Sequence, residues 1–480
     1  MSSSFHTIII GAGFAGLGMG IALKRAGFHD FVLLEKSGDV GGCWRENTYP
    51  GAACDVPSHL YSFSFEPKAD WSRKFAPQAE IHAYLRHCAQ LYQITPHVRL
   101  HQEVSSAVYV GPSQGWEVTL ASGVKLYARF VVTACGQLST PLLPRLPGLD
   151  QFKGPQFHSA QWDHTLDLRG KRVAVIGTGA SAIQFIPKIA PTVQTLTVFQ
   201  RSAPYVLSKP DRPYRAWEKR LFKALPWMQA LSRAKIYGSH ETRAVAFTRV
   251  PWAMGVVRAQ FSRELTRQVP DAPLRQRLTP DHPMGCKRIL ISNDYYPAMS
   301  RANVQLVNTA IRRVTPDGIE TADGQVHPAD VLIYGTGFAA TQFLTPMKVI
   351  GPGALDLNEV WKQGAQAYLG MTVPGFPNFF MLYGPNTNLG HSSIVYMLES
   401  QINHLVRCMS QMQARGIQAI EAPKDRFTRY NDDIDLALQR TVWSQGCRSW
   451  YQTSEGKNPV NWPGFTFTYR WLTWRADLRH

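Results

Sequence analysis

The sequence predicts an α/β fold in which one doubly wound unit is inserted into another. Three observations lead to this prediction. An apolar strand ends in a glycine-rich turn near the N-terminus, the same pattern returns in the middle of the chain, and further apolar strands follow after residue 330. With 480 residues, of which 44% are hydrophobic, the chain is long enough for two or three domains with sizeable cores.

The first unit starts with a short β-branched strand, Thr7–Ile10, and continues into a helical pattern over Leu17–Arg25. Between them, Gly11-Ala12-Gly13-Phe14-Ala15-Gly16 has glycines where a tight turn, a close approach to pyrophosphate and helix–strand packing need them. A second strand, Phe31–Leu34, ends at Glu35, and a carboxylate at this point accepts hydrogen bonds from ribose hydroxyls. Because an acid there repels a 2′-phosphate, this unit is predicted to bind FAD.

The second unit repeats this order. A strand over Arg172–Ile176 leads into Gly177-Thr178-Gly179-Ala180-Ser181-Ala182, with alanine in place of the third glycine, and a helix over Ile183–Ile189 follows. The next strand, Thr195–Phe199, is followed by Arg201 at the position equivalent to the acid of the first unit. Since an arginine pairs with a 2′-phosphate, this unit is predicted to bind NADPH.

The strands that follow are predicted to complete the first unit. Asp330–Tyr334 ends in Gly335-Thr336-Gly337-Phe338, which either passes close to a cofactor or is an ordinary strand-end turn, and Phe379–Tyr383 is another apolar strand. The predicted Rossmann-like architecture is therefore an NADP domain inserted in an FAD domain, with a helical insertion. Its divisions are residues 1–140 (FAD-binding domain, first part), 141–208 (NADP-binding domain, first part), 209–280 (helical insertion), 281–330 (NADP-binding domain, second part) and 331–480 (FAD-binding domain, second part, with a C-terminal control loop).

The formal net charge of +17 is the one unusual feature of the composition. A basic protein concentrates small anions such as dinucleotide phosphates. No recognition motif accompanies the charge, so a nucleic-acid partner is not expected. The stretch 211–277, rich in Arg, Lys and aromatic residues, could touch an anionic membrane surface, but a solvated helical face is the preferred interpretation.

Neither targeting nor metal-binding patterns are found. No apolar run is long enough to span a membrane, and the N-terminus MSSSFHTIII lacks the basic start and cleavage site of a secretory signal. The seven cysteines are scattered and never spaced C-x-x-C, which argues against a disulfide framework, a metal site and a dithiol redox centre. We therefore expect a cytoplasmic protein.

Two longer patterns point to a specific family. The linker Phe152-Lys153-Gly154-Pro155-Gln156-Phe157-His158-Ser159-Ala160-Gln161-Trp162-Asp163 matches F-x-G-x-x-x-H-x-x-x-W-[P/D], and the run from Gly41 to Asp55 matches [A/G]-G-x-W-x4-[F/Y]-P-[G/M]-x3-D. Over essentially its whole length the chain thus resembles the type I Baeyer–Villiger monooxygenases. It looks most similar to the phenylacetone and 4-hydroxyacetophenone monooxygenase group.

The resemblance implies that FAD, NADPH and O2 are used to insert one oxygen atom next to a ketone carbonyl, giving an ester or lactone through a C4a-peroxyflavin. The negative charge of that chemistry requires a fixed cation. In the family's basic loop, which Pro283–Arg288 resembles, Arg288 would face the flavin and Asp55 would keep it in place and ionised. Lys287 would contact the 2′-phosphate beside Arg201 and Ser202.

The resemblance also implies roles for two aromatic or histidine positions. His158 would couple the position of NADP to the flavin site, although a histidine in an aromatic linker can equally be structural. Trp450, in a tail that resembles the family's mobile control loop, would fold over NADP and substrate, or else be a core tryptophan like Trp462 and Trp471.

The candidate residues fall into three groups. The candidate catalytic residues are Arg288 and Asp55. The candidate cofactor-binding residues are Gly11, Gly13, Phe14, Ala15, Gly16, Glu35, Cys43, Trp44, Asp55, Tyr61, Val104, Thr178, Gly179, Ala180, Ser181, Ala182, Gln184, Arg201, Ser202, Lys287 and Arg288. The interdomain signature residues are Phe152, Gly154, His158 and Trp162.

Two other functions remain open at this stage. N- or S-oxygenation of soft nucleophiles uses the same cofactors, but the combination of Trp162, Asp55 and Arg288 favours attack on a ketone. A flavoprotein that acts only as a redox sensor is disfavoured by the second, complete dinucleotide pattern.

Overall fold

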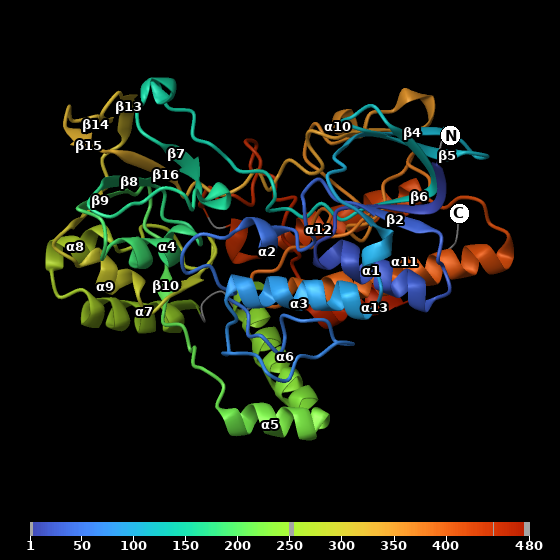
Figure 1. The fold of residues 1–480 in the computed structure, drawn as a ribbon, viewed down its shortest axis with the longest axis horizontal. Coiled ribbons are helices and arrows are strands. Elements are labelled where there is room, and N and C mark those ends of the chain that lie inside the picture. The colour runs from blue at the N-terminus through green and yellow to red at the C-terminus, as the bar shows by residue number, and fades with distance from the viewer. Residues whose placement is uncertain (1–2, 249–253, 445, 475–480) are drawn as a thin grey trace.

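The computed structural model describes residues 3–248, 254–444 and 446–474. Two sheets with helices packed against them lie beside one another, and the chain passes from one to the other more than once (Figure 1). The larger one holds the first glycine turn and the smaller one the second. The predicted α/β class with two doubly wound units is therefore confirmed.

The larger sheet is formed by both ends of the chain. Its strand order is β17-β4-β5-β6-β1-β2-β3, and β18 pairs with β6 as well. Ile8 and Ile9 are fully buried because β1 lies in parallel between β2 and β6. The strands are β1 (Ser3–Ile10), β2 (Phe31–Leu34), β3 (Val98–Arg99), β4 (Val104–Gly111), β5 (Gly115–Leu120), β6 (Lys125–Thr133), β17 (Lys348–Ile350) and β18 (Phe379–Met381).

Helix α1 (Phe14–Arg25) follows β1 directly and is buried on nearly every side, between the sheet and α11 (Ile394–Arg415). Its glycines allow this close packing. A Cβ atom at Gly18 would lie 2.9 Å from Ile402 Cδ1, and one at Gly20 would lie 3.3 Å from Leu33 Cδ1. The other helices of this unit are α2 (Cys43–Glu46), α3 (Gln78–Leu91), α10 (Leu357–Val360), α12 (Lys424–Gln439) and α13 (Thr466–Trp474).

The smaller sheet is parallel throughout, in the order β12-β9-β8-β16-β7. Helices α4 (Ala182–Ile189) and α9 (Tyr295–Met299) pack together beside it, and a small antiparallel sheet, β13-β14-β15, is attached to the unit. The strands are β7 (Gln156–His158), β8 (Arg172–Ile176), β9 (Thr195–Phe199), β12 (Val304–Val307), β13 (Ile311–Thr315), β14 (Gly318–Thr321), β15 (Val326–Pro328) and β16 (Val331–Tyr334).

One predicted division has to be corrected. The strand at residues 331–334 was assigned to the FAD-binding part, but β16 pairs with β8 and β7 in the smaller sheet. All four of its residues are buried, and such a run fits the interior of either parallel sheet equally well. The chain returns to the larger sheet only at β17.

The segment between the two halves of the smaller unit is helical, as predicted. It contains α5 (Ala216–Ala224), α6 (Pro226–Thr248), α7 (Met254–Gln268) and α8 (Ala272–Arg277). Helix α7 packs against α9 and β10 (Val206–Leu207), which pairs with β11 (Leu290–Ile291), whereas α6 reaches the larger unit through Tyr237 and Thr466. Among the described residues no helix is long and apolar enough to cross a lipid bilayer.

Candidate active site

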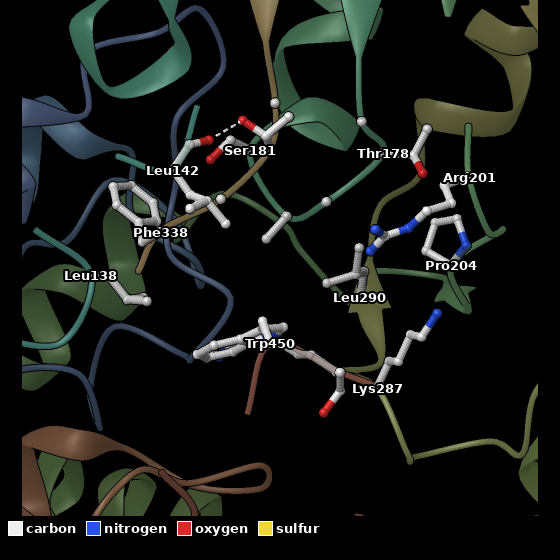
Figure 2. A pocket seen from close by; sticks show the side chains of 18 of the residues that line it. Leu138, Leu142, Thr178, Ser181, Arg201, Pro204, Lys287, Leu290, Phe338 and Trp450 are labelled. Atoms are coloured by element: carbon white, nitrogen blue, oxygen red, sulfur yellow. Dashed lines mark hydrogen bonds between the residues drawn. The ribbon is translucent and has the colours of Figure 1, made fainter. Parts of the chain in front are cut away.

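A cavity of about 1500 Å³ lies between the two units. It is lined by the segment around α2 from the first unit, by the second glycine turn and the end of β9 from the second, and by the loop 448–456 near the C-terminus. Figure 2 shows Arg201 and Lys287 at one end of it and Leu138, Leu142 and Phe338 at the other, with Trp450 between them.

The first glycine turn has little room for side chains. Gly11 has a φ of +104°, and a Cβ atom there would lie 2.6 Å from the Ala134 carbonyl oxygen. A Cβ atom at Gly16 would overlap the Gly11 carbonyl oxygen. At Gly13, by contrast, the nearest atom is Gly42 Cα at 3.5 Å, an ordinary contact. Two of the three glycines are therefore required by the turn itself, and Gly13 is free to serve a ligand.

Glu35 is held in place beside this turn. Its carboxylate accepts hydrogen bonds from the backbone N–H groups of Ala12 (2.9 Å) and Ser37 (3.0 Å), and only 6% of the residue is exposed. No side chain caps the N-terminus of α1. An uncapped helix start beside a fixed carboxylate suits the pyrophosphate and ribose of a dinucleotide, so these residues fit FAD.

The second glycine turn repeats this geometry. Gly177 has a φ of +102°, and a Cβ atom there would lie 2.5 Å from the Gly335 carbonyl oxygen, whereas a Cβ atom at Gly179 would be 3.6 Å from the same atom. The N-terminus of α4 also lacks a side-chain cap. In both turns the glycine with room for a Cβ atom is the second one, Gly13 in the first turn and Gly179 in the second.

Two cations lie beyond this turn. Lys287 Nζ donates to Ser202 Oγ at 2.7 Å, and Arg201 is exposed to the cavity. Burial lowers the pKa of Lys287, and the positive charge of Arg201 lowers it further. Neither cation forms an ion pair within the described part of the chain. Two adjacent cations without an ion-pair partner fit an anionic group, as the 2′-phosphate of NADPH requires.

Arg288 forms an ion pair with Asp55 across the two units. Its Nη2 donates to Asp55 Oδ2 at 2.5 Å, and the side chains are 28% and 31% exposed because both face the cavity. The charge of Asp55 raises the pKa of Arg288. Burial alone would raise the pKa of Asp55, but Arg288 and then Lys209 lower it overall. The pair is therefore fully ionised at neutral pH.

The surroundings of this pair include residues that the motifs did not indicate. Lys209 Nζ donates to the Cys54 carbonyl oxygen at 3.0 Å. The Tyr451 hydroxyl is buried without a hydrogen-bond partner in the described structure, and burial raises its pKa to about 12 although Arg288 opposes this. Tyr383 donates to Asn388 Oδ1 at 2.7 Å. Only proximity in the fold could have revealed these residues.

Gln184 connects the two units. Its Oε1 accepts from the Tyr49 hydroxyl (3.1 Å) and from the Ala53 N–H (3.2 Å), and its Nε2 donates to the Ala53 carbonyl oxygen (3.0 Å). In the first unit, Trp44 Nε1 donates to the Tyr61 hydroxyl at 3.0 Å. Gln184 thus fixes the segment that carries Asp55 against α4, in addition to lining the cavity.

The interdomain signature residues lie in and beside β7, the edge strand of the smaller sheet. A Cβ atom at Gly154 would lie 2.3 Å from the Asp330 carbonyl oxygen. His158 is buried, its Nδ1 accepts from the Ala160 N–H (3.1 Å), and its ring meets Phe338 edge-on at 5.5 Å. Burial lowers the pKa of His158, and a hydrogen bond to the Gly337 backbone partly opposes this.

The aromatic signature residues complete this packing. Phe152 is buried beside Gly154, and Trp162 contacts Phe185 of α4 at 5.2 Å. His158 does not line the cavity, but it contacts Phe338 and the Gly337 backbone, which do. The signature residues therefore support the residues that line the cavity and do not line it themselves.

The C-terminal loop is tied to the second unit by a bond that the sequence did not indicate. Cys286 and Cys447 form a disulfide, with Cα atoms 6.3 Å apart and 161 residues between them in the sequence. The scattered spacing of the cysteines had argued against disulfides, and that interpretation is wrong for this pair. Trp450 lines the cavity three residues beyond Cys447, whereas Trp462 is buried and Trp471 is exposed.

The structure divides the candidate residues into two sets. Those that line the cavity are Cys43, Trp44, Asp55, Tyr61, Thr178, Gly179, Ala180, Ser181, Gln184, Arg201, Ser202, Lys287 and Arg288. Those outside its lining are Gly11, Gly13, Phe14, Ala15, Gly16, Glu35, Val104, Ala182, Phe152, Gly154, His158 and Trp162. The second set forms the first turn, its neighbours and the packing behind the cavity.

Known proteins share both the sequence and this arrangement. Residues 8–250 match the family model described as pyridine nucleotide-disulphide oxidoreductase. A Baeyer–Villiger monooxygenase of Pseudomonas aeruginosa is 46% identical, with 98% of this chain and 89% of that protein covered. An oxidized steroid monooxygenase bound to NADP (32% identical, TM-score 0.88) and OTEMO in complex with FAD and NADP (28%, TM-score 0.90) each cover 98% of this chain and 97% of their own.

Proposed function

Because this chain belongs to the Baeyer–Villiger monooxygenase family, we propose that Arg288 and Asp55 form the polar centre at which its cofactors and a ketone substrate meet. The protein is an FAD- and NADPH-dependent oxidoreductase that inserts oxygen into its substrate. When bound, FAD takes electrons from NADPH and activates O2 for the transfer. This chain's own residues bind and orient the cofactors and the substrate, and they stabilise the negative charge that develops during the reaction.

FAD is held by the first unit in this proposal. The N-terminus of α1 would hold the pyrophosphate at Gly13, Glu35 would accept hydrogen bonds from the ribose, and Trp44 and Tyr61 would border the flavin ring. Support comes from the uncapped helix start and from the ordinary contacts around Gly13, which leave it free for a ligand.

NADPH is held by the second unit. Arg201, Lys287 and Ser202 take the 2′-phosphate, and the N-terminus of α4 takes the pyrophosphate. The absence of an ion pair at either cation in the described residues supports this assignment, since a bound phosphate supplies the missing negative charge. Supply of NADPH also leads us to propose that the enzyme works in the cytoplasm.

The observation that carries the catalytic proposal is the ion pair between Arg288 and Asp55. One hydrogen bond to Asp55 fixes the guanidinium, and its other N–H donors remain for groups in the cavity that it lines. A cation that stays charged and fixed stabilises negative charge that develops on oxygen during the transfer to a carbonyl carbon. The hydrophobic residues Leu138, Leu142 and Phe338 at the far end of the cavity suit an apolar ketone.

The test separates oxygen transfer from NADPH oxidation. Arg288→Ala should retain FAD and oxidise NADPH, but the ester formed per NADPH consumed should fall by about 100-fold, with hydrogen peroxide released instead. Arg288→Lys, which keeps a charge but loses the fork geometry, should lie between wild type and Arg288→Ala. Ester yield by mass spectrometry and peroxide are measured in the same reaction, over a panel of aryl, cyclic and long-chain ketones.

The partner residue provides the control. Asp55→Ala should resemble Arg288→Ala more weakly, and the double variant should be no worse than Arg288→Ala, because the two side chains act as one unit. If Arg288→Ala coupled NADPH oxidation to ester as wild type does, the proposed centre would be wrong. A thioether oxidised in place of every ketone would instead reject the ketone as the substrate class.

A further inference from the structure

The helices α5 and α6 expose apolar side chains to solvent where the chain turns from one to the other. Trp217 is 57% exposed, and Trp227 and Leu231 are both 62% exposed. Figure 1 shows α5 at the foot of the molecule, away from both sheets. We call the surface formed by residues 215–235 the α5–α6 tip.

Several apolar residues of the tip recur at helical spacing. In α5, Trp217, Leu221 and Ala224 follow the spacing i, i+4, i+7. In α6, Trp227 and Leu231 follow the spacing i, i+4 and are continued by Ala230 and Ala234, while Leu225 is exposed between the helices. Of these residues, Leu221 is half-buried, and the others are exposed to solvent.

The opposite sides of these helices are firmly attached. Glu218 is buried and bound by Arg212 at 2.6 Å, and Phe222 meets the ring of His59 edge-on at 4.8 Å. In α6, Gln229 Nε2 donates to the Lys68 carbonyl oxygen (2.7 Å) and Arg233 donates to the His59 carbonyl oxygen (2.7 Å). The tip is therefore a fixed surface, and its exposed tryptophans do not belong to a loosely placed segment.

The charged residues of the tip are all cationic except Glu218. Between Arg212 and Glu241 the only acidic residue is Glu218, which is buried and already paired. Apart from Arg233, which donates to the His59 carbonyl oxygen, the basic residues at the tip are Arg215, Lys219, Arg220, Lys223 and Lys235, and none of these five forms an ion pair within the described residues. An exposed apolar surface that is surrounded by cations without ion-pair partners is complementary to a partner that is both apolar and negatively charged.

We propose that the α5–α6 tip docks the enzyme on an anionic lipid surface. Tryptophan rings are stable at the level of lipid headgroups, and Lys and Arg beside them bind anionic headgroups. A second copy of this chain is a poorer fit, because a symmetric pairing of two tips would bring like charges together and would bury lysines, which interfaces disfavour. The apolar faces then lie against the acyl chains, and the cations lie in the headgroup layer.

The experiment uses the purified holoenzyme and sedimentation with two kinds of vesicle. Wild type should sediment with vesicles of phosphatidylcholine and phosphatidylglycerol, should bind far less to phosphatidylcholine alone, and should be released by high salt. The double variant W217S/W227S should lower binding to the anionic vesicles by about tenfold or more, because it removes the two tryptophan rings that would enter the lipid. Lys219→Gln, Arg220→Gln and Lys223→Gln combined should remove the preference for phosphatidylglycerol.

Matched controls come from elsewhere on the surface. Trp471→Ser removes a tryptophan of α13 that is 72% exposed, and it should leave vesicle binding unchanged. All variants should keep wild-type FAD content and wild-type turnover of a water-soluble ketone, which shows that they are folded. If wild type stays in the supernatant with anionic vesicles, or if W217S/W227S binds as well as wild type, the proposal is wrong. It is also overturned if the tip variants abolish a dimer detected by analytical ultracentrifugation while vesicle binding is absent.

Discussion

The two dinucleotide units have glycine turns of the same geometry but differ in the environment of the charged residue after the second strand. In the first, the residue after the second strand is Glu35, which is buried and accepts two backbone N–H groups. In the second, the corresponding region carries Arg201, which is exposed to the cavity beside Lys287 and has no ion pair within the described residues. The charge of Glu35 is stabilised by the protein's own backbone, whereas the charge of Arg201 is available to a ligand. We propose that this difference lets the same fold retain FAD and bind NADPH reversibly.

The largest effect is expected from blocking each turn at its unobstructed glycine. The nearest protein atom to a Cβ would be 3.5 Å away at Gly13 and 3.6 Å away at Gly179, so the turns themselves accept a methyl group. Gly13→Val should give folded protein with little FAD, and Gly179→Val should keep its FAD but lose most NADPH turnover, because each blocks backbone approach to one pyrophosphate. Flavin absorbance per protein and NADPH consumption measure the two effects.

Gly13→Ala and Gly179→Ala are the milder controls, and thermal melting reports whether the turns still fold. A Gly13→Val enzyme with a full complement of FAD would show that the first turn does not hold the pyrophosphate. The conclusion that both turns bind a pyrophosphate in the same way would then be wrong.

A smaller effect should come from the charge at the end of each second strand. Arg201→Ala should lower kcat/KM for NADPH by about 10- to 100-fold, because a charge-assisted contact contributes about 1.5–3 kcal/mol. It should hardly change kcat/KM for NADH, which has no 2′-phosphate. Steady-state kinetics with both cofactors provides the measurement.

Glu35→Gln is the matched change in the first unit. It should weaken FAD retention and leave the ratio of NADPH to NADH efficiency as in wild type. Equal losses with NADPH and NADH in Arg201→Ala would remove the assignment of the 2′-phosphate site.

These differences show how far the sequence could predict the molecule. The two turns were predictable because only glycine tolerates the φ values at Gly11 and Gly177, so the local sequence determines the local structure. Arg201 and Glu35 were predictable because a strand end places the next residues at the same edge in both units. Local rules thus predicted both turns and the strand ends beside which the two sites are proposed.

The remainder depends on contacts between distant segments. The buried run of β16 suits either sheet, so its sequence alone could not assign it to one. Lys209 reaches the Cys54 carbonyl oxygen only because the chain after β10 folds back onto the first unit. Cys286 and Cys447 meet across 161 residues, and no spacing rule relates them.

The pH dependence of NADPH binding should sharpen the comparison further. Burial and the charge of Arg201 lower the pKa of Lys287 in the free enzyme. As the pH rises through this lowered pKa, Lys287 loses its proton and its attraction for the 2′-phosphate. The KM for NADPH should therefore increase as the pH rises through this pKa, which lies below the usual pKa of a lysine, by less than about tenfold because one contact is weakened rather than removed.

Two measurements control this prediction. The KM for NADH should not follow the same profile, and Lys287→Arg, which stays charged, should flatten the profile for NADPH. The same alkaline increase in Lys287→Arg would attribute the effect to another group.

The smallest effect should come from the disulfide, which ties the C-terminal loop to the second unit. Cys286 directly precedes Lys287, and Cys447 lies in the same loop as Trp450, so the bond restrains the loop that borders the cavity near the predicted 2′-phosphate site. Cys447→Ser should free this loop and increase the KM for NADPH by about twofold to fivefold, since ordering the loop then has an entropic cost at each binding event. FAD content should not change. A reductant should reproduce the effect in wild type and have no effect on Cys447→Ser. Thiol titration of the denatured, unreduced enzyme should detect the five cysteines that are free in the structure, and detection of all seven would show that the restraint does not exist in solution.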